Sequence, residues 1–578
     1  MNKTLLTTAL VFLALGSIRG ARMEVGYCNG EVSETTASKV GKCTVSAAVI
    51  LSPEILSPYK GASVKGVHLY LSTSEGVSDL SGWIRGTLEG ENIDENYAAE
   101  ALTGWQTIPL NGSYEIDGSP VVVGFSFSQA KSVKCITIAG DYNRDGLYVA
   151  KNNDWSSLSS NAGSICVELE IEGDMIPAKD LELRSLTTEY PIVKKGEDLI
   201  IEAELRNASL SVIEGFEYEL KIGDYYSDKS SSSAVIQPKQ VLKLSLPVST
   251  SDFKADVPLS GMLTISTSGD EVESNNSGIT SLAAYEESFK RRLLLEEFTT
   301  ELCVNCPRAI NTIGQAMADG YDEKMTVVAH HVGYNTDWLT LDEDEGLLWL
   351  YGNDGTFAPA VMLDRRVRNK DVLFPVESIG YYDTFGPRLE EALVYPSFVN
   401  VNVAPALGDN EIIVKVKAEA MPVFGILTEN PRLTVVLTED GIVHHSQAGI
   451  SNPEFTHSHV TRAYLTSFDG ELFNWNDNSL EWEGSIAINP EWVVENMEAV
   501  AFISNYNEED PKDCVVFNTG VAHLADASVK DIESDSEIVS VEYFDVQGRK
   551  VSNPDAGLYI VRKYDSKGNI STDKKIFK

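Results

Sequence analysis

Leu293-Leu294-Leu295-Glu296-Glu297-Phe298-Thr299-Thr300-Glu301-Leu302-Cys303-Val304-Asn305-Cys306-Pro307 is an apolar strand pattern that runs directly into two cysteines. An amphipathic helix pattern follows over residues 304–318. The succession of strand, turn and helix places Cys303 at a helix N-terminus, where unpaired backbone N–H groups favour the thiolate over the thiol. Two cysteines separated by two residues can close a small, readily reversed disulfide. This stretch therefore predicts both an α/β architecture and thiol chemistry.

The residues around this stretch continue the alternation of strands and helices. Apolar patterns of strand or helix type follow one another at residues 292–298, 304–318, 325–330, 357–364 and 388–393. Such an alternation is typical of a domain in which helices cover a partly parallel sheet. We therefore expect an α/β domain over residues 286–396.

The strand, the Cys-x-x-Cys turn, the helix and a proline before a later strand together resemble the thioredoxin fold. The resemblance implies that Cys303 is the attacking cysteine and that Cys306 is the resolving one. It also implies that Glu297, six residues before Cys303, is a buried acid that takes the proton of the resolving thiol. Pro359 matches the cis-proline that faces the disulfide in this fold.

The turn also departs from the thioredoxin pattern. Leu302 stands where a tryptophan usually precedes the first cysteine, and the intervening pair is Val304-Asn305 rather than Gly-Pro. Intervening residues tune the reduction potential, so the direction of exchange is left open. A permanently closed, redox-inert disulfide in an exported domain is the alternative.

A narrower resemblance covers residues 286–527. The motif Leu-Leu-Glu-Glu-Phe-Thr before Cys-x-x-Cys-Pro, followed later by segments 434–443 and 457–463, is similar to the outer membrane protein 28-related family of Bacteroidetes-type bacteria. Strand patterns return after Pro396, and we expect residues 397–527 to form a β-sandwich of this family.

The sequence pattern of the N-terminal half predicts β-strands throughout. Short strand patterns between turn residues predict a β-sandwich over residues 22–174, and this segment resembles lectin-like jelly-roll modules of secreted bacterial proteins. Alternating strands continue over residues 175–285, which resemble immunoglobulin-like cell-adhesion-related modules. The predicted fold class is therefore multidomain, with β-sandwich modules flanking one α/β domain.

The N-terminal end indicates export. Residues 1–21 combine a charged start, a short apolar middle and a small-residue exit, which predicts a signal peptide. The apolar run is about a dozen residues long, too short for a bilayer that needs roughly 20. No later segment is long and apolar enough, so we expect no transmembrane segment in the mature chain.

The C-terminal end indicates a sorting signal. Residues 528–537 form an acidic linker, and we expect a small β-sandwich over residues 538–578. The motifs at 541–551, 557–561 and 574–578 resemble the C-terminal sorting domain of type IX secretion cargo. The resemblance implies the type IX secretion machinery as a partner and a secreted, cell-surface or outer-membrane location.

The net charge of the chain limits its partners. A formal charge of −40 and a pI near 4.5 repel nucleic acid and anionic lipid over the whole surface. We expect neither as a partner, and no motif in the sequence calls for a cofactor.

The remaining cysteines suggest structural bonds. In an exported protein, four of them plausibly form two disulfides, with all three connectivities open: Cys28, Cys43, Cys135 and Cys166. Cys514 lies in an apolar strand pattern and is expected to be a buried, inert thiol.

Three weaker signals concern metal ions and tuning groups. Residues 141–146 have the oxygen ligands and the glycine of a calcium loop, but an asparagine replaces the bidentate glutamate at the twelfth position, so we favour a hairpin turn. His457 and His459 would share one face of a strand, and we favour structural hydrogen bonds over a metal site. His330 and His331 end a strand near the cysteine turn, where we favour a solvated position over a role in tuning Cys303.

Two hypotheses for function follow from the sequence. The first is thiol–disulfide exchange on extracellular or surface partners by an outer membrane protein 28-related protein. The alternative is a non-enzymatic adhesin whose sandwich modules bind an unidentified protein or glycan, with the thioredoxin-like unit as scaffold. The reduction potential of the cysteine pair separates them.

Overall fold

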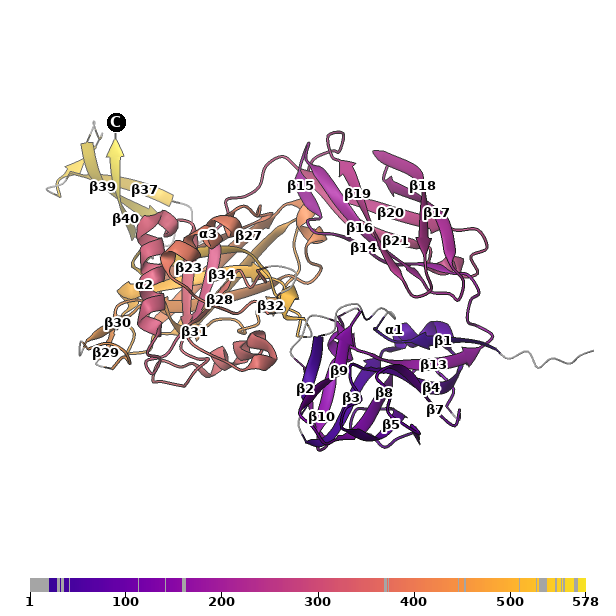
Figure 1. Cartoon of the computed structure of the whole chain (residues 1–578). Coiled ribbons are helices and arrows are strands. Elements are labelled where there is room, and N and C mark those ends of the chain that lie inside the picture. Colours follow the sequence, from indigo (N-terminus) through magenta and orange to yellow (C-terminus); the bar gives the residue numbers. More distant parts are fainter. Residues whose placement is uncertain are drawn as a thin grey trace, which may run out of the picture. The chain divides into compact units, whose positions relative to one another are not determined.

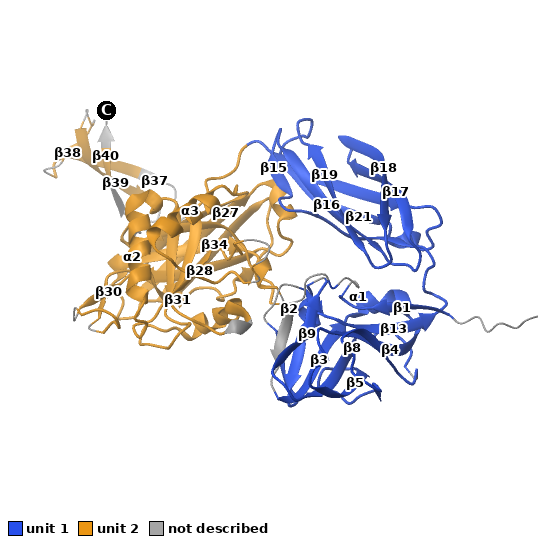
Figure 2. Cartoon of the chain, viewed as in Figure 1, with its two compact units in different colours: residues 1–286 blue, residues 287–578 orange. Residues whose placement is uncertain are grey.

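The computed structural model describes residues 20–577 with gaps at 29–31, 33–35, 41, 113, 141, 159–162, 369–371, 373, 445, 452–453, 509, 527, 530–537, 546–547, 553, 555–556 and 566–569. The described chain is mostly β-sheet, as the sequence predicts (Figure 1). It divides into two compact units, residues 1–286 and 287–578 (Figure 2). The signal peptide expected at 1–21 lies outside the described residues apart from its last two, and so does most of the linker expected at 528–537.

The first half of unit 1 contains two sheets around one apolar core. One sheet has the order β1-β13-β4-β9-β12, with β2 paired to β9 and β7 to β4. Its strands are β1 (Ala21–Val25), β13 (Val167–Gly173), β4 (Ser63–Leu71), β9 (Val133–Ala139), β12 (Ser164–Ile165), β2 (Thr36–Val40) and β7 (Gly104–Pro109). The other has the order β11 (Asp154–Ser157), β10 (Tyr148–Lys151), β3 (Cys43–Leu51), β8 (Val121–Gln129), β5 (Val77–Arg85) and β6 (Asp94–Tyr97). Val67 and Leu169 from the first sheet pack with Val123 and Phe125 from the second.

The second half of unit 1 also contains two sheets. The first has the order β14 (Leu181–Thr188), β16 (Asp198–Asn207) and β19 (Val241–Ser249). The second has the order β15 (Ile192–Lys194), β21 (Ser277–Tyr285), β20 (Leu259–Ser266), β17 (Ile213–Ile222) and β18 (Tyr226–Ile236). Along β16, buried Leu199, Ile201, Ala203 and Leu205 alternate with less buried residues, as a half-covered strand requires.

Unit 2 is built on one long sheet that carries the cysteine turn. Its order is β25 (Glu377–Ser378), β24 (Ala360–Leu363), β22 (Leu293–Phe298), β23 (Met325–His330), β31 (Val460–Tyr464), β28 (Arg432–Glu439), β34 (Met497–Ser504) and β35 (Val516–His523), and β32 (Glu471–Leu472) pairs with β28. Strands β22 and β23 run parallel, whereas β24 is antiparallel to β22. The sheet joins strands from both sides of the boundary predicted at residues 396/397.

Two helices cover one face of this sheet. Helix α2 (Cys306–Ala316) lies between β22 and β23 in the sequence, and α3 (Tyr382–Leu393) follows β25. Leu293 and Leu295 of β22 share one apolar cluster with Ala309 and Ile313 of α2 and Leu389 of α3. Because side chains alternate along a strand, Leu294 faces the other way and packs against Val436, Val500 and Val516.

The sheet curls so that its last strand returns to its first half. Val516 of β35 donates a backbone hydrogen bond to the carbonyl of Asp364 at the end of β24, at 2.9 Å. Unit 2 also contains a sheet of order β33 (Ser479–Ala487), β27 (Glu411–Ala420), β26 (Val399–Leu407) and β36 (Ser528–Val529), and the hairpin β29 (Ile442–His444) and β30 (Phe455–His457).

The last described strands form a small sheet of their own. Its order is β38 (Lys550–Val551), β37 (Ile538–Phe544), β39 (Gly557–Asp565) and β40 (Ile570–Phe577). No helix within the described ranges is long and apolar enough to cross a membrane.

Most elements near the cysteines lie close to their predicted positions. Strand β22 begins one residue later than predicted, and β23 has the predicted bounds. Helix α2 ends at Ala316 rather than 318 and continues into a wide turn, Met317–Tyr321, in which Gly320 adopts φ 91°. Helix α3 begins six residues before the predicted start, and Pro387 lies inside it.

Candidate functional site

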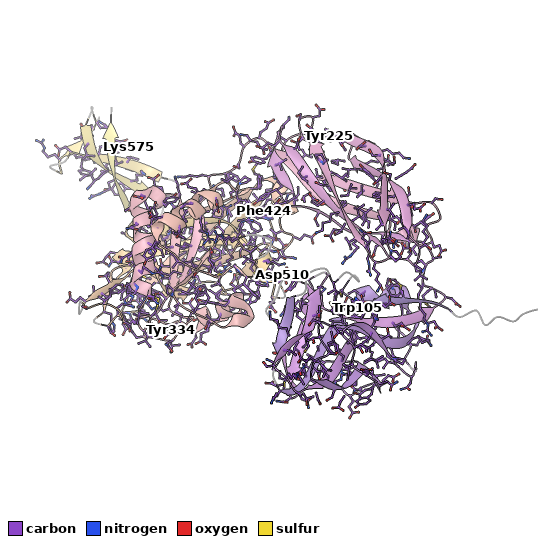
Figure 3. All side chains as sticks on the ribbon, in the orientation of Figure 1. Trp105, Tyr225, Tyr334, Phe424, Asp510 and Lys575 are labelled. Atoms are coloured by element: carbon purple, nitrogen blue, oxygen red, sulfur yellow. A yellow bond between two sulfur atoms is a disulfide. The ribbon has the colours of Figure 1, made fainter. Side chains whose placement is uncertain are left out.

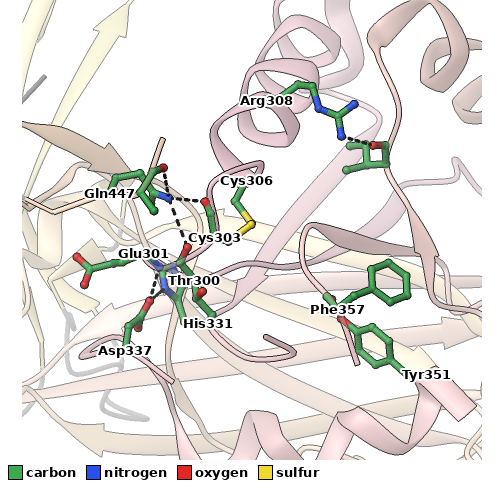
Figure 4. The surroundings of a disulfide bond; sticks show 12 residues. Thr300, Glu301, Cys303, Cys306, Arg308, His331, Asp337, Tyr351, Phe357 and Gln447 are labelled. Atoms are coloured by element: carbon green, nitrogen blue, oxygen red, sulfur yellow. Dashed lines mark hydrogen bonds and ion pairs between the residues drawn. A yellow bond between two sulfur atoms is a disulfide. The ribbon is translucent and has the colours of Figure 1, made fainter. Parts of the chain in front are cut away.

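The cysteine turn joins the end of β22 to the start of α2. Cys303 and Cys306 form a disulfide, and Cys306 is the first residue of the helix (Figure 4). Cys303 was expected at the helix N-terminus, but it lies three residues earlier, where its N–H donates to the Thr300 carbonyl at 3.2 Å. Cys303 keeps 3% of its surface exposed and Cys306 keeps none. The first cysteine is therefore the more accessible of the two, although it is more covered than predicted.

A segment 144 residues further along the chain covers the turn. We name residues 446–450, between β29 and β30, the covering segment. Gln447 Nε2 donates to the carbonyl oxygens of Cys303 at 3.1 Å and Thr300 at 3.4 Å, and Ala448 N–H donates to the Glu301 carbonyl at 2.7 Å (Figure 4). A Cβ on Gly449 would lie 2.4 Å from the Val304 carbonyl oxygen, so only glycine fits there. The covering segment therefore contacts the backbone of the turn at Thr300, Glu301, Cys303 and Val304.

Glu297 lies on the helix-facing side of β22. Because every second side chain of a strand lies on the same face, Glu297 shares the face of Leu293 and Leu295, whose cluster includes α2. Its carboxyl group therefore points beneath the helix that starts at Cys306. The side chain is 4% exposed, and within the described residues its Oε1 has no hydrogen-bond partner. Burial raises the pKa of Glu297 from 4.5 to about 8. This carboxyl group is therefore poised to gain or lose a proton near neutral pH.

Pro359 lies at the same end of the sheet as the cysteine turn. The Ala358–Pro359 peptide bond is cis. The next residue, Ala360, pairs with Phe298, which is the last residue of β22. The cysteine turn begins directly after Phe298. The structure thus brings all four predicted site residues, Cys303, Cys306, Glu297 and Pro359, to one region.

Two buried histidines, His331 and His457, lie beside the turn, although His331 was expected at a solvated strand end. His331, 1% exposed, pairs through Nδ1 with Asp337 Oδ2 at 2.7 Å, and the same oxygen accepts from the N–H of Glu301 at 2.8 Å. The ring of His457 lies 5.2 Å from that of His331. Burial, and then the charge of His331, lower the pKa of His457 to about 4. His457 and His459 were predicted to share one face of a strand. They do not, because His459 lies after the end of β30 and has φ 59°.

His330 belongs to a buried ionic network on the other face of the sheet, rather than to a solvated strand end. Its Nδ1 lies 2.8 Å from Asp344 Oδ1, and its Nε2 lies 3.4 Å from Glu296 Oε1. Burial alone would lower the pKa of His330, but the charge and hydrogen bond of Asp344, and then those of Glu296, raise it to about 9.

Arg365 completes this network. Its Nε and Nη2 donate to the two oxygens of Glu296 at 2.8 and 2.7 Å. Burial alone would raise the pKa of Glu296, but the charge and hydrogen bonds of Arg365 lower it to about 2. Tyr464 of β31 donates to Asp344 Oδ1 at 2.8 Å, so the network links both halves of the long sheet. The charges of the network are paired, as buried charges require, although His330 Nε2, Asp344 Oδ2 and Arg365 Nη1 have no hydrogen-bond partner among the described residues.

The other candidate residues lie away from the turn. Of the four cysteines expected to form two disulfides in the first sandwich, Cys28 and Cys166 lie with their sulfur atoms 3.1 Å apart. Cys514 is fully buried, as predicted, and burial raises the pKa of its thiol. Asp141 of the calcium-like loop lies outside the described residues, and Asn143 Oδ1 accepts from the Asp145 N–H at 2.8 Å. The described part of the chain holds no group of three or more residues suited to a metal ion.

Comparison with known proteins gives one family match. Residues 354–519 match the model of the family described as outer membrane protein Omp28. No curated protein matches the chain.

Solved structures with similar features are distant. HBP35 of Porphyromonas gingivalis is 19% identical, covering 51% of this chain and 100% of its own, with a TM-score of 0.37. A domain of the outer membrane lipoprotein Omp28 from the same organism is 20% identical, covering 21% and 88%, with a TM-score of 0.15. The CARDB domain of a Pyrococcus furiosus protein, solved with di-metal ions, is 13% identical, covering 19% and 90%, with a TM-score of 0.16.

The family match agrees with the location predicted from the sequence, at the cell surface or outer membrane. Residues 354–519 follow the cysteine turn, include most of the long sheet and are similar to the outer membrane protein Omp28 family.

Proposed function

We propose that Cys303 and Cys306 form a thiol–disulfide exchange site in a thioredoxin-like unit over residues 286–396. One observation carries the proposal: a disulfide at the start of α2 lies above a buried carboxyl group, Glu297, which has no ion-pair partner among the described residues. The order β25-β24-β22-β23, with β22 and β23 parallel and β24 antiparallel, supports the thioredoxin-like assignment. The cis bond before Pro359 also agrees with it.

The exchange step needs one attacking and one resolving thiol. In the reduced form, the Cys303 thiolate attacks a partner disulfide, and one partner thiolate leaves. The Cys306 thiolate then attacks Cys303 Sγ, the second partner thiolate leaves, and the Cys303–Cys306 disulfide closes. The partner disulfide is reduced to two thiols while the cysteine pair is oxidised. The same steps in reverse oxidise a partner dithiol.

Glu297 is suited to accept the proton of Cys306. Cys306 is fully buried and cannot lose its proton directly to solvent. A carboxylate with a pKa of about 8 matches the affinity of a thiol for protons, which is the condition for efficient transfer. A buried acid without a partner lowers stability, so its place beneath the cysteine turn supports a functional reason for it.

Insulin reduction tests the proposal directly. The full-length protein should catalyse dithiothreitol-driven precipitation of insulin chains, and Cys303→Ser should abolish the activity. Cys514→Ala is the matched control, because Cys514 is equally buried but belongs to an apolar cluster without Cys303 or Cys306. An unchanged rate in Cys303→Ser, or no activity in the wild type, would leave the disulfide as a scaffold element and favour the adhesin hypothesis.

We also propose that residues 538–578 act as a type IX sorting domain and that the protein is its cargo. The motifs at 541–551 and 557–561 support this, and they fall largely on β37 and β39 of the C-terminal sheet. The paired sheets at residues 22–174 and 175–285 likewise support the lectin-like and immunoglobulin-like assignments. In this account the partners are the secretion machinery and extracellular proteins that carry disulfides.

A further inference from the structure

Two cysteines of the first sandwich lie opposite each other on paired strands. The antiparallel register of β1 and β13 runs from Ala21 opposite Gly173 to Val25 opposite Leu169. Three more steps in the same register place Cys28 opposite Cys166. Directly opposed residues of antiparallel strands have Cα atoms about 4.5–5.5 Å apart, within the range that a disulfide spans.

The side chains agree with this register. The two sulfur atoms are 3.1 Å apart, and a Cβ on Gly26 would lie 2.8 Å from Glu168 Cγ, so the pairing continues beyond the last residue of β1. Both cysteines are fully buried. They form an apolar cluster with Ala139, against which Tyr70 and Trp105 pack. Trp105 is labelled in Figure 3. The two sulfurs therefore face each other in a dry environment.

We propose that Cys28 and Cys166 are joined by a disulfide in the exported protein. The bond forms when both thiols transfer two protons and two electrons to the disulfide of an oxidant in the export compartment, which leaves as two thiols. This assignment selects one of the three connectivities that the four cysteines allow. It is independent of the exchange activity of Cys303.

If Cys28 is bonded to Cys166, Cys43 and Cys135 are the two cysteines of the first sandwich that remain for a second disulfide, and their positions agree with it. Cys43 begins β3 opposite Gln129, and Gln129 Nε2 lies 3.8 Å from Cys135 Sγ. Both cysteines contact the same apolar core.

We expect the bond to form before the sandwich closes, because both sulfur atoms are fully buried in the folded chain. The hydrogen bond between the two thiols, together with burial, also raises the pKa of Cys166 well above its usual range, which disfavours the thiolate that exchange requires. Burial likewise keeps reductants away from the disulfide once it has formed. We therefore expect native protein to resist dithiothreitol at Cys28–Cys166 while unfolded protein does not.

Non-reducing peptide mapping of the full-length protein, purified after export and alkylated in denaturant, tests the proposal. The expected result is a linked peptide pair containing Cys28 and Cys166, and one alkylated cysteine, Cys514. Alkylation of both Cys28 and Cys166, or linkage of either one to Cys43 or Cys135, would overturn it.

Counting thiols in a Cys28→Ala variant gives a second test, and this count does not require the variant to fold. Cys28→Ala should expose one additional thiol per chain in denaturant, located at Cys166, and Cys514→Ala should remove one. The Cys28→Ala protein should also melt roughly 5–10 °C lower in its first sandwich, because the bond spans 138 residues of sequence and restricts the unfolded chain. A thiol count one lower than that of the wild type in Cys28→Ala would contradict the bond.

Discussion

The side-chain amide of Gln447 donates a hydrogen bond to the backbone carbonyl of Cys303 at 3.1 Å, although 144 residues separate them. The amide also reaches the Thr300 carbonyl, and its neighbours Ala448 and Gly449 contact Glu301 and Val304. The covering segment therefore restrains the backbone of the cysteine turn and limits access to the sulfur of Cys303.

Weakening this restraint should make the disulfide easier to reduce. We predict that Gln447→Ala raises the rate of reduction by dithiothreitol about 3- to 10-fold, because one net hydrogen bond is worth about 1 kcal/mol. Stopped-flow alkylation of Cys303 in the reduced protein measures the same access. Gln106→Ala is the matched control, since its Nε2 donates to the Leu102 carbonyl at 2.8 Å in the first sandwich. Equal rates in the two variants would show that the covering segment does not limit access.

Removing the carboxyl group of Glu297 should change the pH dependence of exchange. The wild type should gain activity as pH rises through about 8, where the carboxylate forms and can accept the proton of Cys306. Glu297→Gln should lose this rise and react roughly 100-fold more slowly above pH 8. Single-turnover oxidation of the reduced protein from pH 6 to 9.5 measures it. Identical pH profiles in the two proteins would exclude Glu297 as the base.

The same substitution should also stabilise unit 2 in alkaline solution. The folded-state pKa of Glu297 is raised above its unfolded value, so its contribution to stability is fully present below pH 4.5 and is lost as pH rises through about 8. Glu297→Gln removes this loss, which is worth about 5 kcal/mol. The melting transition of the variant should therefore exceed that of the wild type at pH 9 more than at pH 4.5, by calorimetry. A difference independent of pH would contradict the raised pKa.

Breaking the His330 network should destabilise unit 2 most at low pH. The pKa of His330 is raised from 6.5 to about 9, so the protonated ring contributes stability that is fully present below pH 6.5 and lost as pH rises through about 9. His330→Asn leaves Asp344 and Glu296 without this charge, which costs about 3–5 kcal/mol. The deficit should shrink between pH 6 and pH 9.5.

His523→Asn serves as the control for this measurement. Its imidazole is 63% exposed and lies 3.1 Å from Glu498, so the pair is screened by solvent. We expect a shift of the melting transition within about 1 °C at either pH. A deficit in His330→Asn that stays constant with pH would show that the ring is neutral in the folded protein.

Deleting residues 538–578 should stop export at the periplasm. The sorting assignment predicts that the truncated protein is absent from the cell surface and culture medium and accumulates inside the outer membrane. Protease accessibility on intact cells, with immunoblotting of fractions, measures the location. Surface display of the truncated protein at the level of the full chain would refute the assignment.

Local patterns in the sequence predict the strands around the cysteine turn well. Apolar runs at 293–298 and 325–330 are short and bounded by polar residues, and both become buried strands. The amphipathic helix that follows is also predicted, because its apolar face repeats at helical spacing. The start of α3 is missed because Gly386-Pro387 interrupts the pattern, whereas buried Phe385 and Leu389 on either side hold the helix against the sheet.

Contacts between segments that are distant in the sequence could not be predicted. His330 and His331 read as solvated because their acidic partners, Asp344 and Asp337, lie in a polar stretch with no strand pattern. Gln447 carries no motif at all, and its contact with Cys303 depends on how the hairpin of β29 and β30 is placed. The sequence around Cys303 therefore does not predict the contact between the turn and the covering segment.

The reduction potential of the Cys303–Cys306 pair tests the central claim most directly. The pair should equilibrate with a glutathione or dithiothreitol redox buffer, read by alkylation and mass spectrometry, at a potential between about −270 and −120 mV, where exchange proteins operate. A potential below about −300 mV, together with a Cys303 thiol that resists alkylation at pH 7, would contradict the account and identify a structural bond.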